Sequence, residues 1–410
     1  MEEAKKKYGE VGIGFSKSLW DATIEENILV VCKTPMAKSI TKRTLAGFRD
    51  TKVNAQYYPN LIENISERPE AVVNTFRDGK HFWHINENQN MKFDAIVGNP
   101  PYQLVSSSDN QNRNPPIYHK FVQIGIALSP RYMSLITPAR WYSSNILMGN
   151  FPLEFLSDKR ICYLHDYTNA NDIFPTVEIK SGVCYFLWDR NYNNACIIDS
   201  TINGKTERSS RYLLSEYDDI FIRYNAGIPI IEKVQAMMDA PLSSIVSPQN
   251  PFGFNTAVRG EENKTANSIK IYSKGLVVNY IDKSLVSLHK EWIQKYKVIM
   301  AKAAEDGMLP GKVISTCTII KKDTCCNGTY IVVGPFDSES ECRNAISYLH
   351  TRFVRFLIGM KKMTQDLKDQ TFALVPLQDF SKPWTDEELY KKYSLTDEEI
   401  AFIESMIKPM

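Results

Sequence analysis

The chain has 410 residues, 43% hydrophobic and 23% charged, the composition of a globular protein with room for two domains. Its 49 basic and 47 acidic residues leave a net charge of +2, so binding to an acidic polymer would require locally concentrated positive charge. No segment reaches the roughly 20 apolar residues that span a bilayer, and no apolar run follows the charged start, which predicts a cytoplasmic protein without a membrane partner.

The first predicted strand is residues 28–32, Ile-Leu-Val-Val-Cys. It is followed by Lys33-Thr34-Pro35 and a basic helix that runs to Ala46. Gly12-Ile13-Gly14 lies upstream of this strand, but charged residues rather than an apolar strand precede it, so we expect a flexible turn there.

Residues 93–97 predict a buried strand of a parallel sheet, and this strand runs into Asn99-Pro100-Pro101-Tyr102. Ligands of such sheets lie beyond the carboxyl ends of the strands. The two prolines stiffen the loop and remove competing donors. The side-chain oxygen of Asn99 and the carbonyl of Pro100 can accept hydrogen bonds from both N–H groups of an amino group. Tyr102 offers a face for stacking, so the loop suits chemistry on a base that has been flipped out of a duplex.

A second triplet, Asn114-Pro115-Pro116, ends a polar run that begins at Ser106. It follows no strand and precedes an apolar-periodic segment. We therefore predict that Asn114 is a helix N-cap, with proline in the first turn. Residues 106–114 are expected to form a mobile loop beside the candidate site.

Further strands are predicted at residues 132–137, 160–166 and 182–188. They alternate with helical stretches, which indicates an α/β fold with a parallel or mixed sheet. Asparagine-rich residues 188–210 predict a hairpin and then a crossover into a second region, where the alternation is lost.

Together these features resemble the adenine-specific DNA methyltransferases of restriction-modification systems, of the type II and IIG class, whose catalytic motif is Asn-Pro-Pro-Tyr. The resemblance rests on residues 99–102, 117–121, 132–141 and 172–187. It implies a Rossmann-like methyltransferase sheet in residues 1–200 and an α+β target-recognition, DNA-binding region in residues 201–410. It also implies methyl transfer from S-adenosylmethionine to N6 of a flipped adenine in double-stranded DNA. Asn99, Pro100, Pro101 and Tyr102 would be catalytic, and Phe174 would stack on the base opposite Tyr102.

The chain departs from this family at its N-terminus, where family members bind the methyl donor on a glycine-rich turn after the first strand. The strand at 28–32 has neither those glycines nor the acidic residue expected for the ribose. The sheet is therefore expected to lack its central strand, at about 1–3 kcal/mol for each buried backbone group left unpaired. Three explanations stay open: residues 9–16 form the strand, a partner polypeptide supplies it, or the chain is truncated. The donor-binding residues are unknown.

Two basic stretches are candidate DNA contacts. Residues 343–362 predict a helix whose candidate phosphate contacts are Arg352, Arg355, Lys361 and Lys362. Residues 290–302 are the second candidate. The alternative for both is a solvated helix face.

Eight scattered cysteines, with only Cys325 and Cys326 adjacent, predict reduced thiols and neither disulfides nor zinc. His81 and His84 lack a third ligand, so no metal is predicted. Near the C-terminus, Thr385 with Glu388 and Thr396 with Glu399 predict capping boxes.

Three functions remain open. The leading one is the DNA adenine methyltransferase, with a restriction subunit or a chain that completes the cofactor site as further partners. The second is an N-methyltransferase acting on protein glutamine or RNA, which the long C-terminal half disfavours because base readout needs such a surface. The third is a catalytically incomplete DNA-binding or specificity remnant, which the missing glycine motif favours.

Overall fold

The computed structural model describes residues 13–85, 90–104, 114–143, 146–177, 179, 181–202, 204–214, 219–304 and 309–410. The chain divides into two compact units, each described by itself. Unit 1 comprises Met1–Thr137, Arg160–Tyr163 and Tyr185–Asn193, and unit 2 comprises Pro138–Lys159, Leu164–Cys184 and Asn194–Met410. Because the units exchange segments of chain, the predicted boundary at residue 200 stays a prediction.

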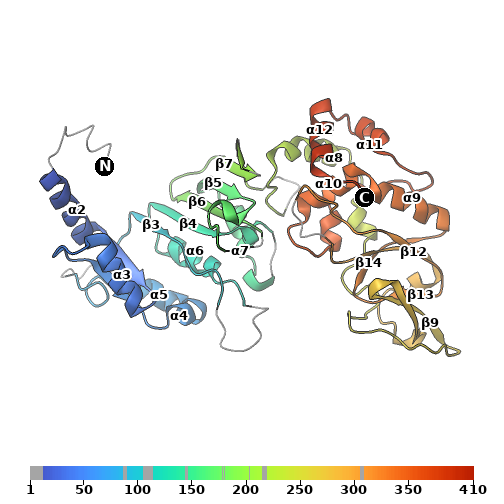
Figure 1. The fold of residues 1–410 in the computed structure, drawn as a ribbon, viewed down its shortest axis with the longest axis horizontal. Helices are drawn as coiled ribbons and strands as arrows, with labels where there is room; N and C mark the ends of the chain where they lie inside the picture. Colours follow the sequence, from blue (N-terminus) through green and yellow to red (C-terminus); the bar gives the residue numbers. More distant parts are fainter. Residues whose placement is uncertain are drawn as a thin grey trace. The chain divides into compact units, whose positions relative to one another are not determined.

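Unit 1 begins with helix α2 (Ile13–Asn27) and strand β1 (Leu29–Cys32), and helix α3 (Pro35–Ala46) then leads to strand β2 (Asn54–Tyr57) (Figure 1, blue). The two strands pair in parallel, which confirms the strand predicted at 28–32. Thr34 ends the loop after β1 because its side chain accepts a hydrogen bond from the Ala37 amide, with Pro35 in the first turn of α3.

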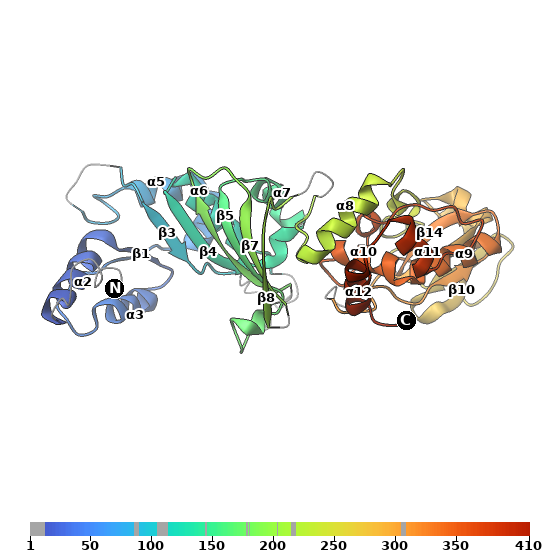
Figure 2. The ribbon, with the colours of Figure 1, turned by 90° about the horizontal axis from the view of Figure 1, so that it is seen from above.

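A six-stranded sheet has the order β3-β4-β6-β5-β7-β8. Its strands are β3 (Ala95–Gly98), β4 (Tyr132–Pro138), β5 (Ile161–Tyr167), β6 (Val183–Asp189), β7 (Cys196–Ile202) and β8 (Lys205–Arg211). Strand β3 runs parallel to β4, whereas β7 and β8 form an antiparallel hairpin, so the sheet is mixed (Figure 2). The four later strands and the hairpin predicted from the sequence are confirmed, and the protein has a mixed α/β fold.

Strand β3 corrects one prediction, because it is exposed rather than buried. Within the described residues it pairs with β4 alone and forms an edge of the sheet. Ala95 and Gly98 are exposed, and Val97 keeps 79% of its surface accessible. A parallel strand is buried only where further strands flank it and helices cover both faces. Strands β1 and β2 form a separate pair, and no strand pairing joins them to β3 in the part of the chain that the structure describes.

The start of helix α2 tests the prediction that residues 9–16 could form the missing central strand of the sheet. Residues 13–16 are helical, so the possibility of a strand at 9–16 is wrong for these positions, and residues 9–12 lie outside the described residues. The turn predicted at Gly12-Ile13-Gly14 is wrong for Ile13 and Gly14 for the same reason, since both belong to the first turn of α2.

Helices α4 (Leu61–Glu67), α5 (Pro69–Arg77) and α6 (Tyr118–Ala127) pack together in unit 1. Their shared core consists of Leu61, Ile65, Val72, Val73, Phe76, Ile117 and Ile124. Helix α6 connects β3 to β4 and lies directly downstream of the candidate site.

Unit 2 contains the end of the six-stranded sheet and two three-stranded sheets, ordered β10-β9-β13 and β12-β11-β14. These strands are β9 (Ser268–Ser273), β10 (Val277–Asp282), β11 (Tyr296–Ala301), β12 (Thr318–Ile320), β13 (Thr324–Cys326) and β14 (Tyr330–Phe336). The helices are α7 (Phe151–Leu156), α8 (Ile228–Ala236), α9 (Glu339–His350), α10 (Arg352–Lys361), α11 (Asp386–Lys392) and α12 (Asp397–Met406). Thr385 and Thr396 form the predicted capping boxes at the starts of α11 and α12.

All eight cysteines are free thiols, and seven of them are buried. Among the helices described here, none combines the length and apolar character needed to cross a membrane.

The edge position of β3 predicts a contrast between neighbouring strands. Val97→Ala should change the free energy of unfolding by less than about 0.5 kcal/mol, because the side chain is already in solvent. Met133→Ala in β4 should cost about 2–5 kcal/mol, because Met133 is fully buried. Urea unfolding of the full chain measures both, and equal losses would contradict the edge assignment.

Candidate active site

The loop after β3 presents one exposed polar side chain on a buried support. Asn99 directly follows the last residue of β3 and is exposed, whereas Pro100 is buried and Pro101 and Tyr102 are half-buried. Pro100 anchors the loop because it is buried, whereas the Asn99 side chain remains outside the core. That amide therefore stays available to an external ligand.

The second proline triplet holds the far end of this loop. The Leu104 amide donates to the carbonyl of Pro115 at 3.0 Å, and the Ile117 amide donates to the carbonyl of Tyr102 at 3.1 Å. Gln103 and Pro116 form an antiparallel bridge between these two hydrogen bonds. The backbone of Tyr102 is therefore fixed from both sides.

This pairing overturns the predicted N-cap at Asn114. Helix α6 begins only at Tyr118, and the residue before it, Ile117, makes no side-chain cap. The reason is that residues 115–117 pair with residues 102–104, so the helix starts after them.

Aromatic packing continues from the loop into helix α6. The Tyr102 ring meets the buried Tyr118 ring edge to face, with centroids 6.5 Å apart. The next residue, His119, is buried, and burial followed by the nearby Lys120 charge lowers its pKa from 6.5 to about 4.

Phe174, the predicted second stacking residue, lies in unit 2 on the segment between β5 and β6. It is half-buried, and its amide donates to the carbonyl of Ala170 at 2.8 Å. Val177 in turn donates its amide to the Phe174 carbonyl at 3.1 Å. Because Asn99 and Tyr102 belong to unit 1, the sandwich of a base between Tyr102 and Phe174 stays a prediction.

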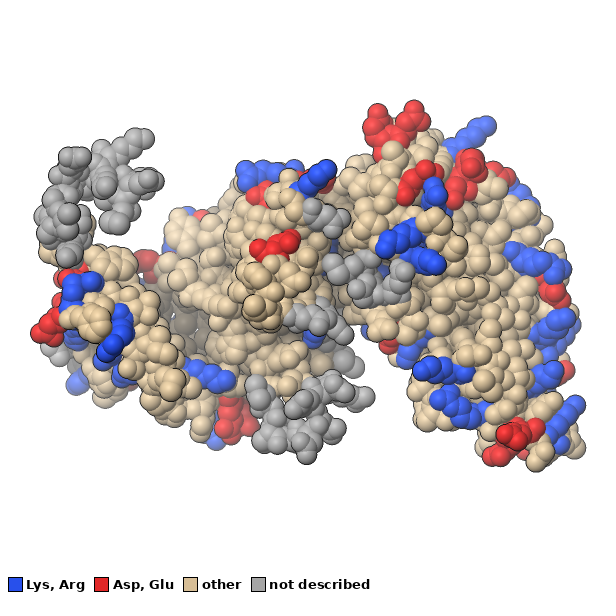
Figure 3. All heavy atoms as spheres, viewed as in Figure 1, with Lys and Arg blue, Asp and Glu red and all other residues tan. Residues whose placement is uncertain are grey.

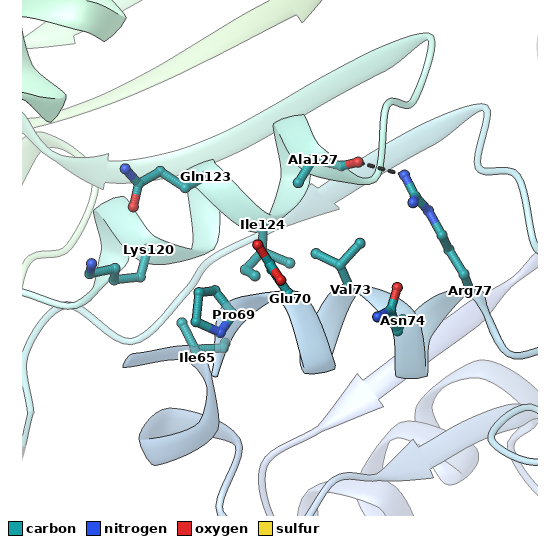
Figure 4. A pocket seen from close by; sticks show the side chains of 10 residues that line it. All are labelled: Ile65, Pro69, Glu70, Val73, Asn74, Arg77, Lys120, Gln123, Ile124 and Ala127. Atoms are coloured by element: carbon teal, nitrogen blue, oxygen red, sulfur yellow. Dashed lines mark hydrogen bonds between the residues drawn. The ribbon is translucent and has the colours of Figure 1, made fainter. Parts of the chain in front are cut away.

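A surface cavity of about 580 Å³ lies elsewhere in unit 1, between helices α4, α5 and α6 (Figure 4). Its polar wall includes Glu70 and Lys120, and Arg77 donates to the Ala127 carbonyl at 2.7 Å at one end. None of its lining residues belongs to the 99–102 loop. The cavity is therefore separate from the candidate site.

The described N-terminal strands do not supply the expected cradle for a methyl donor. Strand β1 is followed by Lys33 and the α3 cap Thr34, and β2 is followed by Tyr58-Pro59-Asn60. Gly14 lies within helix α2. These residues do not fit S-adenosylmethionine in the manner of a glycine-rich turn after a strand.

The four candidate phosphate contacts at residues 352–362 are largely occupied inside unit 2. Arg355 is 3% exposed and donates to the carbonyls of His350 and Lys408, and Lys361 pairs with Asp219 at 2.8 Å. Lys362 is 1% exposed, and only Arg352 is partly accessible, where it pairs with Glu404 at 3.1 Å. The stretch forms two helices, α9 and α10, with core on most sides, so burial argues against phosphate contacts by Arg355, Lys361 and Lys362.

The second basic stretch is not a helix. A short 3-10 turn at Lys290–Gln294 leads into strand β11. Lys297 is completely buried, and its ammonium donates to the carbonyls of Trp292 at 2.7 Å and Lys295 at 2.8 Å. Burial lowers the pKa of Lys297 to about 8. This lysine therefore stabilises the local backbone and cannot contact a phosphate.

A basic surface that the sequence patterns did not single out lies elsewhere in unit 2. Exposed basic side chains lie on and beside the β9-β10 hairpin: Arg259, Lys264, Lys270, Lys274 and Lys283. On the face in Figure 3, basic and acidic side chains are interspersed, and the exposed Glu261 and Glu262 belong to the same segment as these basic residues. The alternation of Ile269, Lys270 and Ile271, one side chain in and the next out, is the signal that identifies such a strand.

His81, one of the two histidines at metal-pair spacing, pairs instead with Asp78 at 2.9 Å. In the part of the chain that is described, no group of three or more His, Cys, Asp or Glu side chains is arranged to hold a metal ion.

Comparison with known proteins shows what the N-terminal segment is similar to. Residues 26–174 match the model of the Eco57I restriction-modification methylase family. A Mycoplasma pneumoniae protein named as an uncharacterized adenine-specific methylase is 35% identical over 156 residues, which are 34% of this chain and 37% of that protein. The predicted resemblance to adenine-specific restriction-modification methylases is confirmed for this segment, and the chain spans little more than a third of that relative.

Solved structures of restriction-modification enzymes are also similar to the chain. The type ISP enzyme LlaGI, as a nuclease-deletion mutant with a DNA substrate mimic, has 10% identity and a TM-score of 0.48, over 90% of this chain and 42% of that one. The type IIG restriction endonuclease BpuSI has 11% identity and a TM-score of 0.33, over 96% and 62%.

The buried His119 predicts acid sensitivity. Its folded pKa of about 4 lies below its unfolded value near 6.5, so the unfolded chain binds the extra proton between these values. The stabilisation linked to the neutral form of His119 is therefore fully present above pH 6.5. It is lost as the pH falls towards 4, and the loss for this group is on the order of 3 kcal/mol. Urea unfolding at pH 7.5 and 5.0 should show a smaller loss for His119→Gln than for the wild type. An unchanged loss would contradict the assignment.

Proposed function

We propose that this protein is a site-specific DNA adenine N6-methyltransferase of a restriction-modification system that uses S-adenosylmethionine as methyl donor. One observation carries the proposal: an exposed asparagine amide follows a parallel strand at its carboxyl end, on a buried proline, within a segment that matches the restriction-modification methylase model. An amide buried in the core would have ruled it out.

The chemistry follows from the acceptors in the loop. The lone pair of adenine N6 is delocalised into the ring and is a poor nucleophile. The Asn99 side-chain oxygen and the Pro100 carbonyl accept hydrogen bonds from the two N6–H groups and favour a tetrahedral nitrogen whose lone pair faces the incoming methyl. Pro101 keeps the loop stiff, and Tyr102 and Phe174 hold the flipped base by stacking.

The DNA partner is proposed to contact the β9-β10 hairpin. Its exposed basic residues outnumber the acidic residues of the same segment, Glu261, Glu262 and Asp282, which gives a small local excess of positive charge in a chain of low net charge. Base readout by the C-terminal half, and a restriction subunit as a further partner, are parts of the same proposal. A cytoplasmic location is proposed because the substrate is cellular DNA.

The absence of a donor cradle after the described N-terminal strands supports another candidate, a DNA-binding or specificity remnant that cannot hold S-adenosylmethionine alone. The unpaired edge of β3 supports a proposal that is consistent with both the methyltransferase and the remnant. In this proposal a partner polypeptide supplies the strand and the turn beside β3. Methylation of protein glutamine or RNA by the same loop is a further alternative, which substrate competition would reveal.

The central test is methyl transfer to duplex DNA. Wild type should methylate adenine, and Asn99→Ala should lower kcat by about 100- to 1,000-fold, because one of the two acceptors on N6 is lost. Asn114→Ala alters the other Asn-Pro-Pro triplet and should keep kcat near that of the wild type. Transfer of labelled methyl to DNA measures all three.

Calorimetric titration with S-adenosylmethionine separates the alternatives. Donor binding without transfer to DNA would favour a different methyl acceptor. Absent donor binding would favour the remnant or a partner-dependent site. Equal activity of wild type and Asn99→Ala would contradict the role of the loop.

The hairpin lysines predict a uniform, salt-dependent loss of DNA affinity. Lys270→Ala with Lys274→Ala should weaken binding to all duplex sequences and lower the slope of log affinity against log salt by about 2. Lys391→Ala, an exposed position on α11, is the matched control. Fluorescence anisotropy at several salt concentrations tests this, and an unchanged slope would place the DNA elsewhere.

A further inference from the structure

A buried ion pair joins the end of β5 to a segment far along the chain. The Arg223 guanidinium donates from Nε to Asp166 Oδ2 and from Nη2 to Asp166 Oδ1, both at 2.7 Å. The Asp166 side chain is 0% exposed and the Arg223 side chain 7%. Burial, the largest single effect, lowers the pKa of Arg223, but the charge and hydrogen bonds of Asp166, with smaller contributions from Tyr142 and Tyr224, together raise that pKa above its ordinary value.

The same guanidinium bonds to both ends of the segment that carries Phe174. It donates to the Tyr167 carbonyl at 3.2 Å, where β5 ends, and to the Ser181 carbonyl at 2.8 Å, two residues before β6 begins. One side chain thus hydrogen-bonds to the backbone at both ends of the segment between β5 and β6.

The backbone at this closure is tightly packed. Ser181 and Gly182 both have positive φ, at 83° and 76°. A Cβ on Gly182 would lie 2.1 Å from the Tyr167 carbonyl oxygen and 2.9 Å from Arg223 Nη2. The two ends of the segment are therefore in close contact, and one of the two carbonyls that accept from Arg223 belongs to Ser181, whose backbone conformation L-residues rarely adopt.

The side chains of residues 220–224 alternate between two environments. Phe221 donates its amide to the Tyr142 carbonyl at 2.8 Å and packs its ring against Tyr142, which follows the end of β4. The alternate residues Ile220, Ile222 and Tyr224 belong to the hydrophobic core shared with helices α8 to α12. Phe221 and Arg223 thus contact residues at or just after the ends of β4 and β5. Ile220, Ile222 and Tyr224 are embedded in the C-terminal core.

We infer that Arg223 is a positioning residue that clamps the Phe174 loop and couples it to the C-terminal core through residues 220–224. This inference rests on the proposed function for its catalytic meaning, because Phe174 is the proposed stacking residue. The structural part, control of the loop by Arg223, stands on the contacts alone. On this account the C-terminal half, which is proposed to read DNA, fixes the loop that holds the flipped base.

Hydrogen exchange of the full chain tests the clamp without requiring activity. The amides of Phe174 and Val177 are hydrogen-bonded within the loop. Arg223→Lys, which cannot make the bidentate fork, should make these amides exchange about 10-fold faster or more, because the loop base opens. Asp166→Asn keeps the volume of Asp166 and should give a smaller change in the same direction.

A matched control is available in the β7-β8 hairpin. Arg208 donates to Asp199 with the same fork, two bonds of 2.7 Å, but its side chain is 69% exposed. Arg208→Lys should leave exchange of the Phe174 loop unchanged. Acceleration in this control as well would show a general loosening and overturn the inference.

Activity adds a readout that a merely structural role would not move. With duplex DNA that carries adenine at the target position, Arg223→Lys should lower kcat by about 10- to 100-fold with little change in KM for DNA. In a separate duplex, 2-aminopurine replaces the target adenine; it has no 6-amino group to methylate and reports base flipping alone, and Arg223→Lys should reduce its fluorescence signal. A rise in KM with unchanged kcat would contradict a role at the flipped base.

The outcomes are distinguishable from failure of the proposed function. If the wild type transfers no methyl group, the enzyme proposal fails, and exchange in the Phe174 loop still decides whether Arg223 clamps it. If Arg223→Lys and Asp166→Asn both leave the loop amides as protected as in the wild type, the clamp is overturned. If both variants unfold globally, the pair is core support rather than a clamp, and the inference is equally overturned.

Discussion

The parallel pairing of β3 with β4 sets the position of the candidate active site. The last register pair joins Gly98 to Leu135, and Asn99 is the next residue after it. A strand fixed on one side by a ladder of hydrogen bonds delivers its terminal residue to a defined place, even though the strand itself is exposed. Pro100 then enters the core, so the chain turns away and leaves the amide at the surface. The position of the acceptor thus depends on backbone pairing rather than on burial.

Rigidity at the other end of the loop comes from the backbone as well. Residues 102–104 and 115–117 pair with each other, which fixes the Tyr102 carbonyl. In unit 2, Arg223 hydrogen-bonds to Asp166 and to the Ser181 carbonyl at one end of the segment that carries Phe174. Under the proposed function, a stacking residue on a clamped segment would lose less conformational entropy when a base arrives, which is a general source of preorganisation.

Strands β3 to β6 were predictable from the sequence because each contains a short apolar run near turn residues, and that pattern depends only on neighbours in the chain. The exposure of Val97 was not predictable, because whether a parallel strand is central or at an edge depends on which strands lie beside it. The same limit explains residues 352–362. Their basic residues suggested a DNA face, yet Arg355 and Lys361 bond to a carbonyl and a carboxylate distant in the sequence. The Arg223–Asp166 pair, 57 residues apart, also leaves no local signal.

The open edge of β3 and the absence of a glycine-rich turn in the described N-terminal strands have one physical explanation under the proposed function. In doubly wound sheets the ligand lies where the direction of strand order reverses, at the carboxyl ends of the strands on either side of that point. Strands β1 and β2 are linked through α3, and β3 and β4 through α6. If the proposed function holds, a doubly wound sheet would have this reversal between β1 and β3, which no described strand pairing joins. Ala95, Ile96, Val97 and Gly98 carry no charge and no proline, so this edge lacks the usual protection against pairing. An added parallel strand would remove apolar surface from water and place its own carboxyl end beside Asn99. Under the proposed function, one added strand would therefore both cover the unpaired edge of β3 and contribute to the donor site.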